Sequence, residues 1–266
     1  MQTTTTTTTT DAAPDTRRQS RDPLWLFAAI AVPTGWIALT VPFVLGLPTE
    51  PFVLVTLVLG LVLPALVLTR RDPRASVRNL VADVVRMPRP RWLLLPALLL
   101  IPGVSWLVAL PLGAAEPLSI GLVQAAAVAF ASSFVIVNLW EEMAWAGFFQ
   151  RRAMTRWGYL TGSLVTAGLF AAVHLPLAVG TARSVGDVVR GLVPLVAAGI
   201  GMRLLIGAFD TWTGGSIFAL AMLHATFNVT PQFLDGHDVV RYGVTLGLGL
   251  IAAVVLVRRG TIGGER

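Results

Sequence analysis

The stretch PLSIGLVQAAAVAFASSFVIVNLWEE, residues 117–142, carries no charge until it ends in two adjacent glutamates. A stretch of this length and polarity predicts a helix that crosses a membrane. Carboxylates are expensive to place in or near a bilayer, so Glu141 and Glu142 mark a functional site by default. Two histidines, His174 and His224, lie in the middle of later apolar segments. Carboxylates and imidazoles in apolar helices suggest proton chemistry inside the membrane.

Composition places the whole chain in the membrane class. Of its 266 residues, 55% are hydrophobic and only 13% are charged. We therefore expect one integral membrane domain, residues 23–259, behind a disordered threonine-rich lead, residues 1–22, and before a short cytoplasmic tail, residues 260–266. The chain has no cysteine, which excludes disulfides, thiolate metal sites and a cysteine nucleophile.

Eight apolar segments are long enough to cross a bilayer, at about 20 residues per crossing. They are residues 24–46, 51–69, 92–112, 119–150, 159–180, 191–209, 216–234 and 242–257. All 20 basic residues are arginine, and 16 of them fall on one side of these segments against three in the alternate loops. This asymmetry predicts an all-α bundle of about eight helices with both termini in the cytoplasm. It also attributes the net charge of +6 to topology, so we expect no nucleic-acid partner.

The long basic loop after the second segment has an amphipathic pattern of its own. Apolar residues recur at i, i+3, i+4, i+7 and i+8 in residues 77–85, and charged residues lie off that stripe. The pattern predicts a short helix on the inner membrane surface, with anchoring as its simplest role.

Helix geometry brings the polar residues to a similar depth. The fourth and fifth segments turn near residues 156–158, and Glu141 and His174 lie nearly equal numbers of residues from that turn. Antiparallel helices place such residues at the same level. His224 and Asn228, four residues apart, share one face of the seventh segment. We expect these four side chains within about 10 Å of one another, lining a cavity open towards the cytoplasm.

Each polar residue also has a simpler interpretation. A lone histidine within a span, or an asparagine such as Asn138, often forms a structural hydrogen bond between helices. The glutamate pair also suits a proton-relay or ion site in a transporter. Transporters commonly show internal repeats, and no convincing repeat relates residues 1–133 to residues 134–266. Together, the carboxylates, imidazoles and amide supply a general base, a second polarising group and an oxyanion donor, which are the components of a hydrolase.

At these residues the chain resembles the CPBP family, the CAAX-protease and bacteriocin-processing (Abi) group of intramembrane endopeptidases. The family pattern is EExxxR, FxxxH and HxxxN on successive helices of an eight-span bundle. It is matched in order by EEMAWAG (residues 141–147), FAAVH (170–174) and HATFN (224–228), over roughly residues 119–234. The resemblance implies that Glu141 and His174 activate a water for attack on a peptide carbonyl. It further implies that His224 and Asn228 stabilise the oxyanion, with Glu142 in support.

The chain departs from the family pattern at one position, where Ala146 replaces the arginine. In the pattern that arginine can pair with the second glutamate one turn away. An unpaired buried carboxylate costs several kcal/mol or takes up a proton. We therefore expect another arginine to approach Glu142. The candidates are Arg151, Arg152 and Arg203, of which Arg203 is favoured as the only basic residue within a span.

The metal requirement and the substrate follow less directly from the residues. Glu141, His174 and His224 form a legitimate zinc ligand set if a metal takes part. The chain has no HExxH motif, so we favour a mechanism without metal or other cofactor. The arginine-only, alanine- and valine-rich composition favours a multi-pass protein of a bacterial inner membrane.

The predicted function is an intramembrane endopeptidase. Its partners are the lipid bilayer and a membrane-associated peptide of open identity and prenylation state. The alternatives are a catalytically impaired immunity or scaffold protein, which Ala146 keeps open, and a proton-coupled transporter.

Overall fold

The structure is a computed structural model that describes residues 22–260, and within that range it is helical and has no β-strand. Most of the predicted lead, residues 1–22, and most of the predicted tail, residues 260–266, lie outside the described residues. The all-α prediction is confirmed for the described part of the chain.

The helices follow one another with short connections. The first half of the chain forms α1 (Pro23–Leu45), α2 (Glu50–Val55), η1 (Thr56–Val62), α3 (Leu63–Arg71), α4 (Val77–Val84), η2 (Arg91–Leu93), α5 (Leu94–Ala109) and η3 (Leu110–Leu112). The second half forms α6 (Ile120–Ser132), η4 (Ser133–Asn138), α7 (Leu139–Glu142), η5 (Met143–Gln150), α8 (Arg151–Val179), α9 (Val185–Thr213), α10 (Ile217–Val229), η6 (Thr230–Phe233) and α11 (Asp238–Arg258). The elements η1, η4 and η5 are π-helical, and η2, η3 and η6 are 3₁₀ turns.

Six helical stretches in the described residues are long and apolar enough to cross a membrane. They are Pro23–Leu45, Glu50–Arg71, Arg91–Leu112, Ile120–Val179, Val185–Thr213 and Asp238–Arg258. The fourth stretch is 60 residues long and leaves helical geometry at Gly158 (φ 77°, ψ 166°), so it contains both the fourth and the fifth predicted segments. The seventh predicted segment corresponds to α10, which has 13 residues. The protein is therefore a multi-pass membrane protein, while the count of eight crossings stays a prediction.

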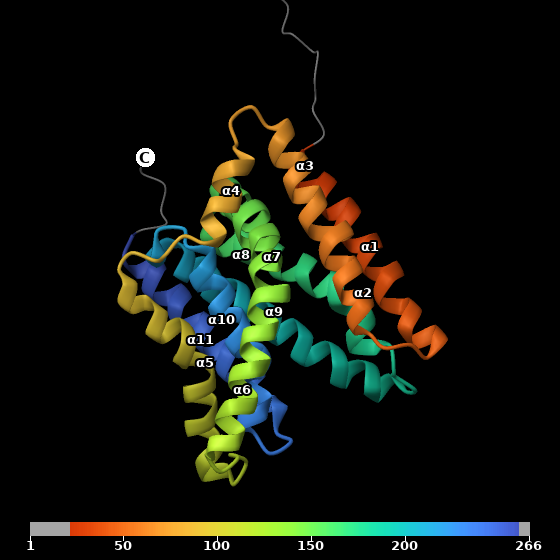
Figure 1. The fold of residues 1–266 in the computed structure, drawn as a ribbon, viewed down its shortest axis with the longest axis vertical. Coiled ribbons are helices and arrows are strands. Elements are labelled where there is room, and N and C mark those ends of the chain that lie inside the picture. Colours follow the sequence, from red (N-terminus) through yellow and green to blue (C-terminus); the bar gives the residue numbers. More distant parts are fainter. Residues whose placement is uncertain (1–21, 261–266) are drawn as a thin grey trace, which may run out of the picture.

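The described chain begins and ends at the same end of the bundle (Figure 1). The short amphipathic helix α4 lies at that end as well, as an anchor beside the termini would. An even number of crossings requires this arrangement. Which side of the membrane this end faces stays a prediction from the arginine asymmetry.

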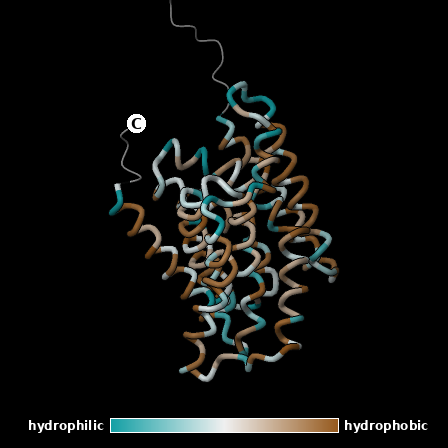
Figure 2. The backbone as a smooth tube through the Cα atoms, turned by 60° about the vertical axis from the view of Figure 1, so that its left-hand side comes forward, coloured by the Kyte–Doolittle hydropathy of each residue, from teal (hydrophilic) through white to brown (hydrophobic). Residues whose placement is uncertain are grey.

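The outer surface of the bundle is apolar along its length. Figure 2 shows hydrophobic backbone along the helices and hydrophilic segments mainly at the two ends. Large apolar side chains are exposed on this surface, among them Trp92 at 63%, Leu95 at 62% and Ile120 at 79%. Exposed apolar side chains on so many helices are expected of a protein that lies in lipid.

Small residues bring α9 close to α11. A Cβ atom added to Gly249 would lie 2.3 Å from the backbone oxygen of Gly201, a distance that real Cβ atoms essentially never show. Only glycine therefore lets the two helices approach so closely, which is the usual role of small residues between helices in membranes. Gly201 is two residues before Arg203 on α9, so this contact also helps to fix the position of Arg203.

Candidate active site

The two glutamates form the end of α7, a single helical turn between the π-helical segments η4 and η5. Neighbouring residues on a regular α-helix point about 100° apart, so two adjacent side chains rarely face the same interior equally. Here Glu141 is 7% exposed and Glu142 is fully buried. A π-helical turn contains an extra residue and redirects the side chains beside it, and such turns recur at functional sites.

Glu142 is held by an arginine from another helix. Its two carboxylate oxygens accept hydrogen bonds from Nη1 and Nη2 of Arg203, on α9, at 2.8 and 2.7 Å. Both side chains are fully buried. His224, on α10, places its Nδ1 2.6 Å from Oε1 of the same carboxylate. We call Glu142, Arg203 and His224 the inner network.

The prediction that an arginine from elsewhere in the chain compensates for Ala146 is therefore confirmed. Arg203 supplies the charge that the family pattern takes from the glutamates' own helix. Ala146 is 1% exposed and belongs to the same apolar cluster as several residues of α9, namely Met202, Leu204, Leu205, Ile206, Ala208 and Phe209. The small side chain thus leaves the space that α9 occupies.

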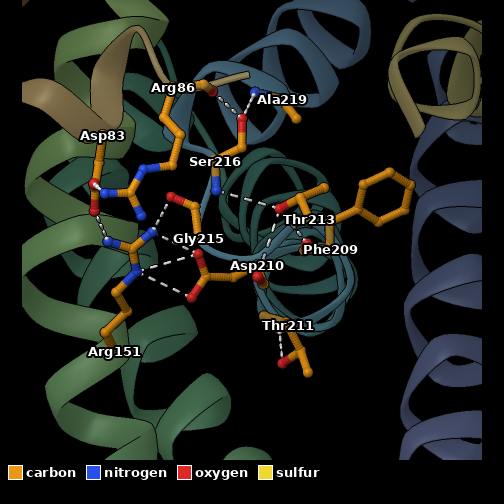
Figure 3. A network of polar contacts seen from close by, with 11 residues as sticks. Asp83, Arg86, Arg151, Phe209, Asp210, Thr211, Thr213, Gly215, Ser216 and Ala219 are labelled. Carbon is orange, nitrogen blue, oxygen red and sulfur yellow. Dashed lines mark hydrogen bonds and ion pairs between the residues drawn. The ribbon is translucent and has the colours of Figure 1, made fainter. Parts of the chain in front are cut away.

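The other two candidate arginines bind elsewhere. Arg151 donates to both oxygens of Asp210 at 2.7 to 3.1 Å, to Asp83 at 2.7 Å and to the backbone oxygen of Gly215 at 2.8 Å. Arg86 forms an ion pair with the other oxygen of Asp83 at 2.6 Å. Figure 3 shows these side chains converging from α4 and the segment that follows it, from α8 and from the end of α9. We call Asp83, Arg86, Arg151 and Asp210 the outer network.

Arg152, the third candidate, also lies away from Glu142. It donates a hydrogen bond to the backbone oxygen of Phe148 at 2.9 Å and lies 3.6 Å from a carboxylate oxygen of Asp72. The structure thus separates three arginines that the sequence presented as alternatives.

Glu141 faces the second histidine, His174. The ring nitrogen Nδ1 of His174 lies 2.8 Å from the backbone oxygen of Phe170. A carbonyl oxygen can only accept, so this contact places the proton on Nδ1 and leaves Nε2 as an acceptor in the neutral ring. That Nε2 lies 3.6 Å from Oε1 of Glu141. Two acceptors so close together are satisfied by a proton, or by a donor such as water, between them.

Asn228 lies beside two polar residues of η4. Its Nδ2 is 3.3 Å from Oγ of Ser133 and 3.3 Å from Oδ1 of Asn138. Ser133 itself donates to Oδ1 of Asn138 at 2.6 Å. Asn138 is fully buried, and its contacts fit the structural interpretation that its lone position suggested. Ser133 was missed in the sequence, because a serine five residues from Asn138 on a regular α-helix would not share its face.

A cavity of about 520 Å³ unites the predicted site residues, because Glu141, His174, His224 and Asn228 all line it. The close contacts above likewise place three of these side chains together: Oε2 of Glu141 is 3.9 Å from Nδ1 of His224 and Oε1 is 3.6 Å from His174. The predicted convergence of the polar residues of three helices is thus observed.

The cavity does not extend in the predicted direction. Its remaining lining residues come from the middle of the helices and from the ends farthest from the chain termini: Leu39, Val53, Thr56, Leu57, Leu61, Val137, Phe170, Val173, Leu177, Ala178, Arg190, Gly191, Pro194, Leu195, Ala198, Phe227, Arg241 and Tyr242. The expected opening towards the side of the termini is wrong. On that side Phe27 packs against Trp145, Phe148 and Phe149 with ring centroids 5.3 to 5.7 Å apart, and this aromatic cluster fills the space.

The site residues do not form a metal-ligand group as they are placed. Within residues 22–260, no three histidine, cysteine, aspartate or glutamate side chains are arranged to hold a metal ion. His224 directs its Nδ1 towards Glu142, whose charge is already paired with Arg203. These contacts engage only Nδ1 of His174 and His224, and a metal-bound histidine commonly donates its other ring nitrogen to a carboxylate or carbonyl. The arrangement therefore does not decide between the zinc ligand set of Glu141, His174 and His224 and chemistry without a metal, which stays a prediction.

Comparison with known proteins finds a family match over part of the chain. Residues 123–230 match the sequence model of the family described as type II CAAX prenyl endopeptidase Rce1-like. The matched range contains all three motifs and every predicted site residue. No curated protein matches the chain significantly.

Proposed function

We propose that the protein is an intramembrane endopeptidase acting on a membrane-associated peptide, a proposal that the match of residues 123–230 to the CAAX prenyl endopeptidase family supports. The observation that carries the proposal is the pair of facing acceptors, Glu141 Oε1 and His174 Nε2, 3.6 Å apart on the wall of an otherwise largely apolar cavity. A water molecule between them donates one proton to each and directs a lone pair into the cavity. A peptide carbonyl placed there is within reach of attack.

The reaction then proceeds in two steps. The water oxygen forms a bond to the carbonyl carbon while Glu141 takes the proton, and the carbonyl oxygen becomes an oxyanion. The carbon–nitrogen bond then breaks as the oxyanion reforms the carbonyl and the proton passes from Glu141 to the leaving amine, which gives a carboxylic acid and an amine. Glu141 acts first as general base and then as general acid.

Glu142 determines what His224 contributes. Its carboxylate accepts from Nδ1 of His224 at 2.6 Å, which fixes the orientation of the ring. A protonated His224 donates through Nε2 to the developing oxyanion, with the amide of Asn228 on the same helix face as a second donor. Arg203 keeps Glu142 ionised and in place. The catalytic residues are thus Glu141, His174, His224 and Asn228, and Glu142 positions His224.

The catalytically impaired alternative rested on the missing motif arginine. Arg203 forms a bidentate ion pair with Glu142 from α9. This pair supports an active enzyme, because the charge requirement at Glu142 is met in another way.

Cleavage of a library of membrane-associated peptides by the purified protein in lipid nanodiscs tests the proposal. Glu141→Gln keeps the shape of the side chain and removes the base, so we expect cleavage to fall by about 10²- to 10⁴-fold. Glu50→Gln, the same change at an exposed glutamate outside the cavity, is the matched control. Full activity in Glu141→Gln rules out the proposed mechanism.

The metal question has its own measurement. We expect activity to survive prolonged treatment with strong chelators, and elemental analysis to find well under one equivalent of zinc per chain. A stoichiometric metal that is lost with activity and restored with it contradicts the metal-free mechanism.

A further inference from the structure

A second buried arginine lies at the far end of the cavity. Arg241, in the first turn of α11, is 9% exposed and lines the same cavity as Glu141. Its guanidinium carbon lies 4.5 Å from the centre of the Phe227 ring and 4.6 Å from that of Tyr242, which hold the group in place. The proposed chemistry does not use this arginine.

The guanidinium of Arg241 is poorly satisfied by the protein. An arginine has five N–H donors. Nη1 of Arg241 donates to the backbone oxygen of Phe227 at 3.2 Å, and Nη2 donates to the hydroxyl of Tyr242 at 2.7 Å. Nε has no hydrogen-bond partner among the described residues. The carboxylate of Asp238 is 3.6 Å away, beyond hydrogen-bond distance, and is 52% exposed.

A buried cation whose counter-ion is half-exposed and beyond hydrogen-bond distance is incompletely compensated, so a further anion would stabilise it. Nε of Arg203 is also without a hydrogen-bond partner among the described residues, so the two arginines differ in their counter-ions. Both Nη groups of Arg203 donate to a fully buried carboxylate at 2.7 to 2.8 Å. Both Nη groups of Arg241 donate only to neutral oxygens, and their remaining hydrogens are free to bind a carboxylate.

The position of Arg241 relates it to the catalytic residues. Phe227, over which its guanidinium stacks, follows His224 by three residues on α10. Three residues of α-helix rise about 4.5 Å. The ring that holds Arg241 thus lies about one helical turn along α10 from His224, a separation that a few residues of extended peptide cover.

We propose that Arg241 binds a carboxylate of the peptide substrate, and that this contact selects peptides with a negative charge a few residues from the cleaved bond. The inference rests on the proposed peptidase function. The carboxylate has two sources in a peptide, the C-terminus and an acidic side chain, and both present the same chemistry to the guanidinium. The apolar wall of the same cavity, with Leu57, Leu177 and Leu195 among its residues, accommodates the intervening side chains.

Binding decides the matter without requiring turnover. The Glu141→Gln protein in nanodiscs is titrated with three fluorescent peptides of one sequence that end in a free carboxylate, in an amide, or in an amide after a glutamate. We expect the free acid, the glutamate peptide or both to bind at least tenfold more tightly than the plain amide. The peptide that binds tightly identifies the source of the carboxylate. Equal affinity for all three peptides overturns the proposal.

Substitution assigns the effect to this residue. Arg241→Gln should reduce the affinity for the preferred acidic peptide by about tenfold or more and leave the amide peptide nearly unchanged. Arg190→Gln removes the same charge at the same cavity, but Arg190 is exposed and paired with Asp187, so its effect should stay below about twofold. Equal losses in the two variants contradict a specific contact. If Arg241→Gln does not fold, the comparison of peptides on Glu141→Gln still decides.

The same peptides, given to the protein with Glu141 intact, separate the two proposals. Preference for the acidic peptide in binding with no cleavage of any peptide refutes the peptidase function and leaves the carboxylate site standing. Cleavage of the acid and the amide peptides with equal KM supports the peptidase function and refutes the carboxylate site.

Discussion

The inner and the outer network both join helices through ion pairs between arginine and carboxylate side chains, but the two networks differ in how deeply these side chains are buried. In the inner network one arginine, Arg203, meets one carboxylate, and both are fully buried. In the outer network Arg151 meets two carboxylates and a backbone oxygen, and the side chains of Arg151, Asp83 and Asp210 remain 24%, 12% and 12% exposed. Figure 3 shows how several elements share the outer network.

This difference predicts how each network responds to damage. Loss of Arg203 leaves the Glu142 carboxylate buried with no other cation in contact except a protonated His224. Loss of Arg151 leaves carboxylates that water reaches, and Asp83 keeps its ion pair with Arg86. The inner network should therefore be essential to folding and to the site, whereas the outer network should contribute gradually to stability.

The largest effect is expected from Arg203→Ala. Removal of one partner of a buried ion pair costs about 3 to 5 kcal/mol in the free energy of unfolding. Denaturant titration in detergent measures this loss. Peptide cleavage per folded molecule should fall at least tenfold, because Arg203 no longer holds Glu142 in the position where it orients His224. Arg258→Ala, at the exposed end of α11, is the control. A loss below about 1 kcal/mol with normal cleavage contradicts the assigned role.

Restoring the family's arginine sharpens the same comparison. Ala146→Arg alone should destabilise the protein by about 1 to 3 kcal/mol, because the position is 1% exposed and already packed. In the Arg203→Ala background the new side chain has both the space and the partner that Arg203 leaves. We expect the double variant to recover part of the stability and cleavage of the unsubstituted chain. If the double variant is no better than Arg203→Ala, the charge at Glu142 depends on the geometry of α9.

A smaller effect is expected from Arg151→Ala in the outer network. Hydrogen bonds to charged groups contribute about 1.5 to 3 kcal/mol each when buried, and partial exposure here reduces the loss to about 2 kcal/mol in all. Cleavage per folded molecule should stay within about twofold, because the network does not touch the cavity. Abolished cleavage in a folded Arg151→Ala protein shows that the two networks are coupled.

The smallest effect is expected from Arg86→Ala. The side chain of Arg86 is 49% exposed, and exposed ion pairs contribute about 0 to 1 kcal/mol. Arg151 still pairs with Asp83 after this change. The free energy of unfolding, measured at low and at high salt, should differ from that of the unsubstituted chain by less than about 1 kcal/mol. A loss as large as that of Arg151→Ala contradicts the ordering of the network.

Motif spacing located the polar residues of the site well. Glu141, His174, His224 and Asn228 are in sequence segments whose depth followed from residue counts around two turns, and all four line one cavity. Residue counts give the level of a side chain along a helix, but the contacts also depend on rotation about the helix axis. The π-helical segments η4 and η5 change that rotation beside the glutamates, and Ser133 reaches Asn138 and Asn228 for this reason. Nothing in the composition of these segments distinguishes them from regular α-helix.

Arg241 is a residue whose place in the cavity could not be predicted from the sequence. In the sequence it was one of three arginines assigned to loops on one side of the membrane, and only its charge entered the argument. The packing of α11 against the end of α10 turns it into a buried group on the cavity wall. No pattern around Arg241 in the sequence indicated a binding role.

The sequence by itself determined the membrane class, the helical fold and the resemblance to a protease family, because hydropathy and motif spacing are properties of short stretches of chain. Only the tertiary structure decided which arginine pairs with Glu142 and at which end of the bundle the cavity lies. Both depend on contacts between helices distant in sequence: Arg203 is 61 residues from Glu142, and Phe27 comes from α1 to fill the end nearest the termini. Such contacts are fixed by the volumes and rotations of packed helices, which the order of residues does not reveal.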